Sequence, residues 1–198
     1  MTPENGWTND GAHSVLGQEA PGAPLPDGFF SRARQALINY DFSDPNIVVG
    51  HFDPDAPFVA RTMLLEIKVW GLHFLSGVRV HSVRDEVIKN ELENKTVFGF
   101  RYDTLEGHIE RGFEWFLLTK DHDSGAIDFK IEAHWQLGDF PNWWSKLGFK
   151  LVGERSRERW RRSALERLTR LGNQPQGKAA APEGELAHRG DEKPQRTA

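Results

Sequence analysis

The stretch Phe98–Phe116, which reads FGFRYDTLEGHIERGFEWF, holds the side chains best suited to chemistry in this chain. One histidine, four acids, two arginines and a tyrosine stand there between two aromatic-rich runs. Elsewhere in the chain, charged and apolar residues are not crowded together in this way. We therefore expect any functional site to include this segment.

The centre of the segment has two interpretations. In the first, His108 lies at the mouth of a pocket and exchanges protons near neutral pH, while Glu110 orients its ring. In the second, Asp103, Thr104 and Gly107 are turn residues that cap local backbone groups, and His108 is a structural histidine. The sequence leaves both open.

Glu114 alternates with Phe116 and Leu118, which predicts that its carboxylate points toward the interior. A buried carboxylate is costly unless it is paired or protonated. Arg101 and Arg111 are the partners we expect for it. Glu114 is then either a ligand-anchoring or acid/base group with a perturbed pKa, or half of a structural ion pair.

Hydrophobic periodicity predicts antiparallel strands on both sides of this segment. The clearest alternation is that of Ala126–Gln136, where every second residue is apolar. Gly71 and the Ser76-Gly77 pair mark bends, and 121–125 a hairpin turn. The predicted strands are Asn46–Phe52, Thr62–Phe74, Val78–Glu86, Asn94–Tyr102, Arg111–Thr119 and Ala126–Gln136.

Helices are expected on either side of the strands. Asp27 can cap a short helix that runs to about Asn39, and a long helix covers about Phe149–Leu171. The long helix has an apolar stripe through Trp160 that can cover one face of the sheet. These elements predict an α+β domain in which a curved antiparallel sheet of about six strands is gripped by the C-terminal helix.

The opposite face of the long helix is rich in arginine, over Arg155–Arg162. Such a run is typical of a solvated helix face, and it can also meet phosphate or an anionic surface. Trp143-Trp144 precedes the helix and is interpreted as packing at its base, as a lid or as a membrane-touching edge.

Composition limits the alternatives. Residues 1–24 and 173–198 are rich in Gly, Pro and charge, which predicts a disordered leader and tail around a single domain at 25–172. A net charge of −4 argues against nucleic-acid binding, and the absence of cysteine excludes a disulfide framework. No signal peptide or transmembrane run is evident, and no cofactor or metal motif, so we expect a cytoplasmic protein.

The segment resembles the signature of uncharacterised protein family 0548, roughly GF-x-Y-G-T-L-x-G-H-x-E-x-G-E-E-x-F. The matching residues are Gly99-Phe100, Tyr102, Thr104-Leu105, Gly107-His108, Glu110, Gly112, Glu114 and Phe116. Asp103 stands where the motif has glycine, and Phe113 replaces the first acid of its Glu-Glu pair. A looser likeness extends from about Leu25 to Leu168. The family resembles the helix-grip superfamily of START and pollen-allergen-like proteins, which implies binding of apolar molecules and, in some members, catalysis.

Three functions follow from these observations. The first is binding of a small apolar or amphipathic molecule in a cavity between the sheet and the C-terminal helix. The second is an enzyme of cyclase, dehydratase or hydrolase type, with His108 and Glu110 or Glu114 as acid and base. The third is an interaction module that uses the arginine-rich face. The residues predicted to line the cavity are Phe98, Phe100, Tyr102, Arg101, Trp115, Phe129 and Trp160.

Overall fold

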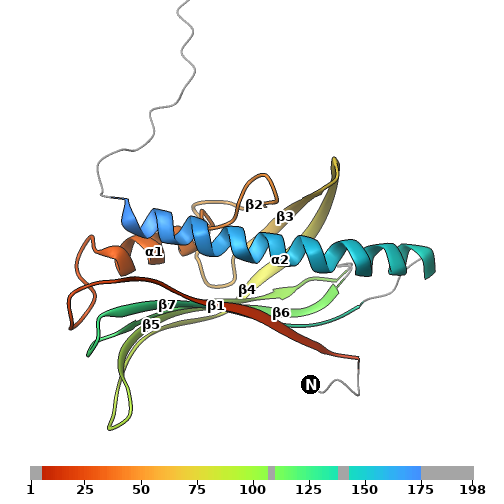
Figure 1. The fold of residues 1–198 in the computed structure, drawn as a ribbon. Coiled ribbons are helices and arrows are strands. Elements are labelled where there is room, and N and C mark those ends of the chain that lie inside the picture. The colour runs from red at the N-terminus through yellow and green to blue at the C-terminus, as the bar shows by residue number, and fades with distance from the viewer. Residues whose placement is uncertain (1–5, 107–109, 138–142, 175–198) are drawn as a thin grey trace, which may run out of the picture.

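The computed structural model describes residues 6–106, 110–137 and 143–174. Seven strands and two helices follow one another along this part of the chain (Figure 1). They are β1 (Thr8–Gln18), α1 (Phe29–Ile38), β2 (Val48–His51), β3 (Thr62–Val69), β4 (Leu72–Lys89), β5 (Asn94–Thr104), β6 (Glu110–Asp121), β7 (Ala126–Leu137) and α2 (Trp143–Asn173).

The strands form one antiparallel sheet in the order β1-β7-β6-β5-β4-β3-β2. Side chains alternate between its two faces, so Phe100 on β5 and its register partner Phe116 on β6 point the same way. This face, the inner face, is covered by α2, which runs across the sheet, and by α1, which lies beside the C-terminal end of α2 (Figure 1). The predicted α+β architecture with a long C-terminal helix gripping an antiparallel sheet is confirmed.

The core lies between the inner face and α2 and is dominated by aromatic rings. The ring centroids of Phe100 and Phe116 are 4.9 Å apart, and that of Trp160 on α2 is 6.2 Å from Phe116. Phe42, which follows α1, contacts Phe116 at 5.2 Å and Phe129 on β7 at 6.1 Å. Edge-on and tilted contacts at these distances are favourable and fill space, so the middle of the interface is packed.

The prediction of a disordered leader over 1–24 is wrong for its central part. Residues 8–18 form β1, which pairs with β7 and adds a strand to the six that were expected. Composition failed here because it counts apolar side chains, whereas an edge strand is held mainly by backbone hydrogen bonds to one neighbour. Leu16, only 5% exposed, is the main apolar anchor of β1.

Several predicted boundaries also move. Ser76-Gly77 is not a turn but lies inside β4, while Gly71, with φ of 78°, does form the β3–β4 turn. The N-cap of α1 is Gly28 rather than Asp27. Helix α2 begins at Trp143, six residues before the predicted start at Phe149. The roles proposed for the side chains of Trp143-Trp144 stay predictions, and the predicted tail from 175 onward lies outside the described residues.

The first turn of α1 receives its cap from a distant residue. The Glu19 carboxylate accepts hydrogen bonds from the backbone N–H of Phe30 at 2.7 Å and of Leu25 at 3.2 Å. The N-terminal amides of a helix lack partners within the helix, and a negative charge there is favourable. A carboxylate from the end of β1 therefore stabilises the start of the next element. Within the described residues, the structure has no helix that is both long and apolar enough to cross a membrane.

Candidate functional site

A group of polar side chains lies on the inner face beneath α2, beside the aromatic core. We call it the polar cluster. Its members are Asp10 on β1, Tyr40 after α1, Tyr102 on β5, Glu110 and Glu114 on β6, Trp135 on β7, and Arg157 and Arg161 on α2. Strand alternation places these strand residues on the same face as Phe100 and Phe116, and the spacing of four places both arginines on one side of the helix.

Glu114 is the most enclosed acid of the cluster. It stands opposite Tyr102 in the β5–β6 register, and the Tyr102 hydroxyl donates a hydrogen bond of 2.6 Å to Glu114 Oε2. Its other oxygen, Oε1, is 4.0 Å from Arg161 Nη2, which is too long for a hydrogen bond. Burial raises the pKa of Glu114, and the hydrogen bond from Tyr102 and the charge of Arg161 only partly oppose this.

Arg161 connects this acid to β1. Its Nη1 forms an ion pair of 2.6 Å with Asp10 Oδ2, yet the Arg161 side chain is only 6% exposed. Burial acts to raise the pKa of Asp10, but the hydrogen bond and charge of Arg161 outweigh it and the pKa is lowered. Two further donors of this guanidinium, Nε and Nη2, are buried without a hydrogen-bond partner. The Nη1 atom of Arg161 is therefore paired, whereas its Nε and Nη2 atoms lack a hydrogen-bond acceptor.

One turn earlier on α2, Arg157 repeats this pattern. It forms an ion pair with Glu110, and its guanidinium lies over the Trp135 ring at 4.2 Å from the centroid. Burial raises the pKa of Glu110 although Arg157 opposes the shift. The Nε of Arg157 and the indole Nε1 of Trp135 are both buried and lack a hydrogen-bond partner.

Incomplete hydrogen bonding distinguishes the polar cluster from the rest of the interior. Six buried side-chain polar atoms lack a partner in the described residues, and five belong here: Tyr40 Oη, Trp135 Nε1, Arg157 Nε, and Arg161 Nε and Nη2. Every one of these atoms can donate a hydrogen bond. A buried donor without an acceptor costs about 1–3 kcal/mol, and folded proteins keep few of them. Five such donors therefore lie together in the polar cluster, where a group with hydrogen-bond acceptors would satisfy them.

Comparisons with known proteins identify the family of the chain. The family model described as a domain of unknown function (DUF1990) matches residues 1–166 of the chain. The chain belongs to the DUF1990 family. This match begins before β1 and ends within α2, so it contains every residue of the polar cluster.

Two curated relatives carry the description "UPF0548 protein". One, from Dictyostelium discoideum, is 26% identical over 126 residues, which cover 62% of this chain and 57% of the relative. The other, from Deinococcus radiodurans, is 29% identical over 140 residues, which cover 66% of this chain and 62% of the relative. The chain thus spans about three fifths of the length of these relatives. The predicted resemblance to uncharacterised protein family 0548 is confirmed.

Solved structures resemble the DUF1990 chain more distantly. Ara h 8.0201 has a TM-score of 0.47 at 10% identity, over 84% of this chain and 98% of that chain. Norcoclaurine synthase from Thalictrum flavum, solved in complex with dopamine and hydroxybenzaldehyde, has a TM-score of 0.46 at 7% identity, over 85% of this chain and 88% of that chain. At this level the likeness concerns the arrangement of the elements and not a ligand or a reaction.

The seven residues predicted to line a cavity fall into two groups: five lie on the inner face or on α2, and two lie on the opposite face of the sheet. Tyr102 belongs to the polar cluster, Phe98, Phe100 and Phe129 lie on the inner face of the sheet, and Trp160 lies on α2 against that face. These four are packed core residues, between 0% and 7% exposed. Their contribution to a ligand site stays a prediction.

Arg101 and Trp115 do not point toward α2, so their prediction as inward-facing ligand residues is wrong. Both lie on the opposite face of the sheet, the outer face, because each is one residue out of phase with Tyr102 or Phe116. Arg101 binds Asp103 through hydrogen bonds of 2.7 and 2.9 Å. It is therefore not the partner of Glu114, whose neighbours are Tyr102 and Arg161.

Of the predicted acid/base residues, Glu110 and Glu114 meet in the polar cluster, and His108 lies outside the described residues. Asp10, Tyr40, Arg157 and Arg161 were missed. Two of the missed residues carried a detectable signal, since positions 157, 161, 164 and 168 share the helical spacing of the buried stripe. The arginine-rich face is accordingly solvated at Arg155, Arg159 and Arg162, while Arg157 and Arg161 turn inward.

The family motif contains structural as well as cluster residues. The Thr104 hydroxyl accepts a hydrogen bond of 2.9 Å from the Gly112 amide on the neighbouring strand. Asp103 and Thr104 lie within β5, so the interpretation of these two as turn residues is wrong. A Cβ atom at Gly112 would lie 2.0 Å from the His134 carbonyl oxygen, so only glycine allows β6 and β7 to approach there. Among the motif residues that the structure describes, Tyr102, Glu110 and Glu114 are the ones left for chemistry.

The two departures from the family motif meet on the outer face. Asp103 and Phe113 are register partners in β5 and β6, and the Arg101 guanidinium lies 4.7 Å from the Phe113 ring centroid while it binds Asp103. A carboxylate missing from position 113 is thus replaced by one directly across the strands, within reach of the same arginine. Neither departure touches the polar cluster.

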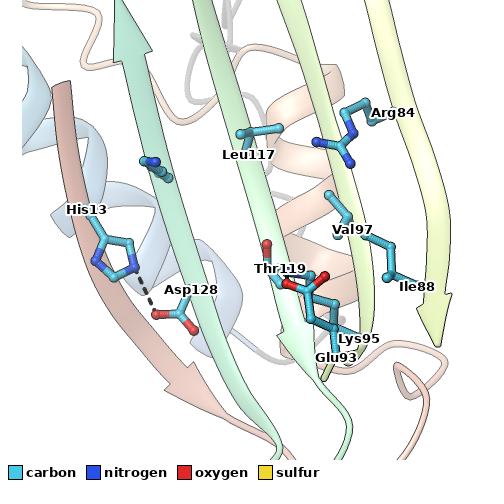
Figure 2. Close-up of a pocket in the computed structure, with 10 residues that line it drawn as sticks. His13, Arg84, Ile88, Glu93, Lys95, Val97, Leu117, Thr119 and Asp128 are labelled. Atoms are coloured by element: carbon cyan, nitrogen blue, oxygen red, sulfur yellow. Dashed lines mark hydrogen bonds and ion pairs between the residues drawn. The ribbon is translucent and has the colours of Figure 1, made fainter. Parts of the chain in front are cut away.

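A depression of about 560 Å³ lies elsewhere on the outer face, over β1 and β4–β7 (Figure 2). Its charged residues have partners on the same surface: His13 contacts Asp128 at 3.1 Å, Lys95 pairs with Glu93, and Lys130 with Glu132. Exposed pairs of this kind contribute little energy and leave no donor in need of a ligand. The polar cluster is the stronger site.

Proposed function

We propose that the protein binds a small amphipathic molecule between the inner face of the sheet and α2, with the polar group of that molecule received at the polar cluster. The observation that carries the proposal is the set of buried donors without acceptors on Tyr40, Trp135, Arg157 and Arg161. A bound acceptor would remove a desolvation penalty that the unliganded protein bears at each donor. The apolar part of the molecule would contact the aromatic side chains beside the cluster.

The second function, catalysis by acid/base chemistry, is favoured by a specific feature of the same residues. Glu110 and Glu114 both have a raised pKa because they are buried, and raised carboxyl groups are suited to donating protons near neutral pH. In this version Glu114, hydrogen-bonded to Tyr102, is the acid that a bound substrate meets. The third function, docking through the arginine-rich face, is less well supported because Arg157 and Arg161 are used internally.

Native mass spectrometry of freshly purified protein tests the binding proposal. We expect a co-purifying small molecule that is retained in Arg162→Gln and lost or reduced at least tenfold in Arg161→Gln. The two residues are adjacent on α2, but Arg162 is exposed and Arg161 is buried, so the pair separates the site from the general charge of the helix.

The binding proposal fails if no molecule co-purifies and the protein takes up no apolar probe in a saturable manner. Catalysis is tested with Glu114→Gln. If the bound molecule is converted by the native protein, the variant should hold it unchanged, whereas a pure binding protein converts nothing in either form.

A further inference from the structure

The polar cluster is unusual in the kind of hydrogen-bonding group that it leaves without a partner. Its unsatisfied atoms are a phenol hydroxyl, an indole N–H and three guanidinium N–H groups. Nitrogen atoms of indole and guanidinium donate and cannot accept. A ligand group that fits this surface must therefore supply acceptor oxygen atoms, which excludes an ammonium or another donor-only cation.

The charges of the cluster decide between an anionic and a neutral acceptor. Arg161 is paired with Asp10 and Arg157 with Glu110, so two cations are already matched by two anions. Glu114 has no cation within hydrogen-bond distance, and burial favours its neutral form. An anionic ligand would add an unmatched charge to a buried site, which is costly. A neutral acceptor adds none.

The geometry around Glu114 further limits which chemical group of a ligand can bind there. Oε1 of Glu114 and Nη2 of Arg161 are 4.0 Å apart, and an oxygen atom beside this gap can lie within hydrogen-bond distance of both. Oε2 is already occupied by the Tyr102 hydroxyl, so Oε1 is the oxygen available for a proton. An oxygen that accepts from a protonated Oε1 and from Nη2 needs no proton of its own.

We propose that the polar cluster recognises the carbonyl oxygen of an otherwise apolar ketone, aldehyde or ester, which accepts hydrogen bonds from Arg161 Nη2 and the protonated carboxyl of Glu114. This inference rests on the proposed function and names its ligand class. A hydroxyl group fits less well, because it brings a donor that requires Glu114 to be ionised. The two alternatives therefore differ in their dependence on pH.

Glu114 is the titrating group in this scheme. The ionisable groups that surround it are Asp10 on β1, Tyr40 after α1, Tyr102 on β5, Glu110 on β6, and Arg157 and Arg161 on α2. The pKa of each tyrosine is raised by burial and by the neighbouring Glu114, so both stay protonated in the working range of pH. The pKa of Asp10 is lowered, whereas that of Glu110 is raised like that of Glu114. Glu110 pairs with Arg157, and Glu114 is the acid beside Arg161 Nη2, so in this scheme Glu114 is the acid whose protonation controls the binding of a carbonyl.

A pair of fluorescent probes tests the proposal on the full chain. The first is 6-propionyl-2-(dimethylamino)naphthalene, an apolar ketone, and the second is 2-(dimethylamino)naphthalene, which lacks the propionyl group. We expect the ketone to bind about tenfold or more tightly than its analogue, since one buried hydrogen bond to a charged donor has roughly this effect. The infrared carbonyl band of the bound ketone should move to lower wavenumber than in an apolar solvent.

The dependence of ketone affinity on pH shows whether the proton of Glu114 takes part in binding. Affinity for the ketone should fall as pH rises through the pKa of Glu114, approaching tenfold per pH unit, and this fall should vanish in Glu114→Gln. An affinity that rises with pH, or that is flat in the native protein, overturns the proposal.

One variant removes the guanidinium that the proposal assigns to the carbonyl. Arg161→Gln deletes Nη2, which lies 4.0 Å from Glu114 Oε1. Arg162→Gln, at the exposed neighbouring position, is the matched control. Arg161→Gln should weaken ketone binding severalfold and leave binding of the analogue unchanged, while the control changes neither.

The outcomes separate the two proposals. If both probes bind equally in all variants, the carbonyl inference fails and the proposed function stands. If neither probe binds, both fail. Thermal unfolding of each variant, measured without probe, confirms that it is folded before its affinity is compared, and Arg161→Lys, which keeps a cation for Asp10 but lacks Nη2, serves if Arg161→Gln does not fold.

Discussion

Two buried charged side chains beneath the helices, Lys120 and Arg161, differ in how completely they are hydrogen-bonded. Under α1, the Lys120 ammonium, 0% exposed, contacts Glu19 Oε2 at 2.6 Å and the Ala23 carbonyl oxygen at 3.1 Å. Glu19 also accepts the backbone amides of Leu25 and Phe30. Under α2, Arg161 is almost as deeply buried, yet two of its donor atoms have no partner.

This difference distinguishes a buried charge that stabilises the fold from one that is available to a ligand. A buried charge that is paired and fully hydrogen-bonded fixes the elements that supply its partners, in this case the end of β1, β6 and the start of α1. A buried charge whose donors lack acceptors bears a desolvation cost, and the binding of another molecule can remove that cost. Two charged side chains can therefore be equally buried and have different roles. The number of their donors that lack an acceptor distinguishes the two roles.

The largest effect is expected at the satisfied pair. Lys120→Met would leave the Glu19 carboxylate, 5% exposed, without its cation, and removal of one partner of a buried pair costs about 3–5 kcal/mol. We expect a loss of this size in the free energy of unfolding, measured by urea denaturation.

The matched control is Lys130→Met, because Lys130 is 51% exposed and its pair with Glu132 lies on the outer face. It should change stability by less than about 1 kcal/mol. Similar losses in the two variants would show that the Glu19–Lys120 pair is not the structural anchor described above.

An intermediate effect is expected from two buried tyrosines of the polar cluster. Tyr102→Phe removes a hydrogen bond to Glu114 and should cost about 1–3 kcal/mol, because it leaves a buried acceptor without its donor. Tyr40→Phe removes a hydroxyl that makes no hydrogen bond of ordinary length and geometry, although Tyr102 is near enough to act on its pKa, so the stability of the unliganded protein should change by less than about 1 kcal/mol. Chemical denaturation without ligand measures both. Equal costs would mean that the Tyr40 hydroxyl is bonded after all, which would weaken the comparison.

The smallest effect concerns the pH dependence of stability. The folded-state pKa of Glu114 is raised, so the native state binds its proton more tightly than the unfolded chain does. Its contribution to stability is therefore lost as pH rises from the ordinary glutamate value, about 4.3, through the folded-state pKa. Relative to the native protein, Glu114→Gln should gain stability over the same interval and keep the gain above it. A difference that stays constant from pH 4 to pH 8 would contradict the raised pKa.

Local patterns predicted much of the sheet. The alternation in 126–136 gave β7 almost to the residue, and the alternation around Glu114 gave its inward orientation. The sequence did not show which face of β5 and β6 points inward, because both faces carry large or charged residues. The predicted cavity lining therefore mixed the two faces and included Arg101 and Trp115. Nothing in the polar run of β1 distinguished an edge strand from a loop.

The partner of Glu114 could not be found along the sequence. Arg101 and Arg111 were expected because they are near in the chain, whereas Arg161 is distant and reaches Glu114 only because α2 crosses the sheet there. Asp10 required both the position of β1 beside β7 and the position of α2 above it.

The sequence by itself determined the types of the elements from α1 to α2, the family and the motif that supplies Tyr102, Glu110 and Glu114, because periodicity and local residue chemistry act over a few neighbouring positions. Only the tertiary structure decided which charges are buried together and which donors stay without acceptors. The reason is that hydrogen bonds and desolvation depend on distances between atoms of different elements, and no local pattern encodes those distances.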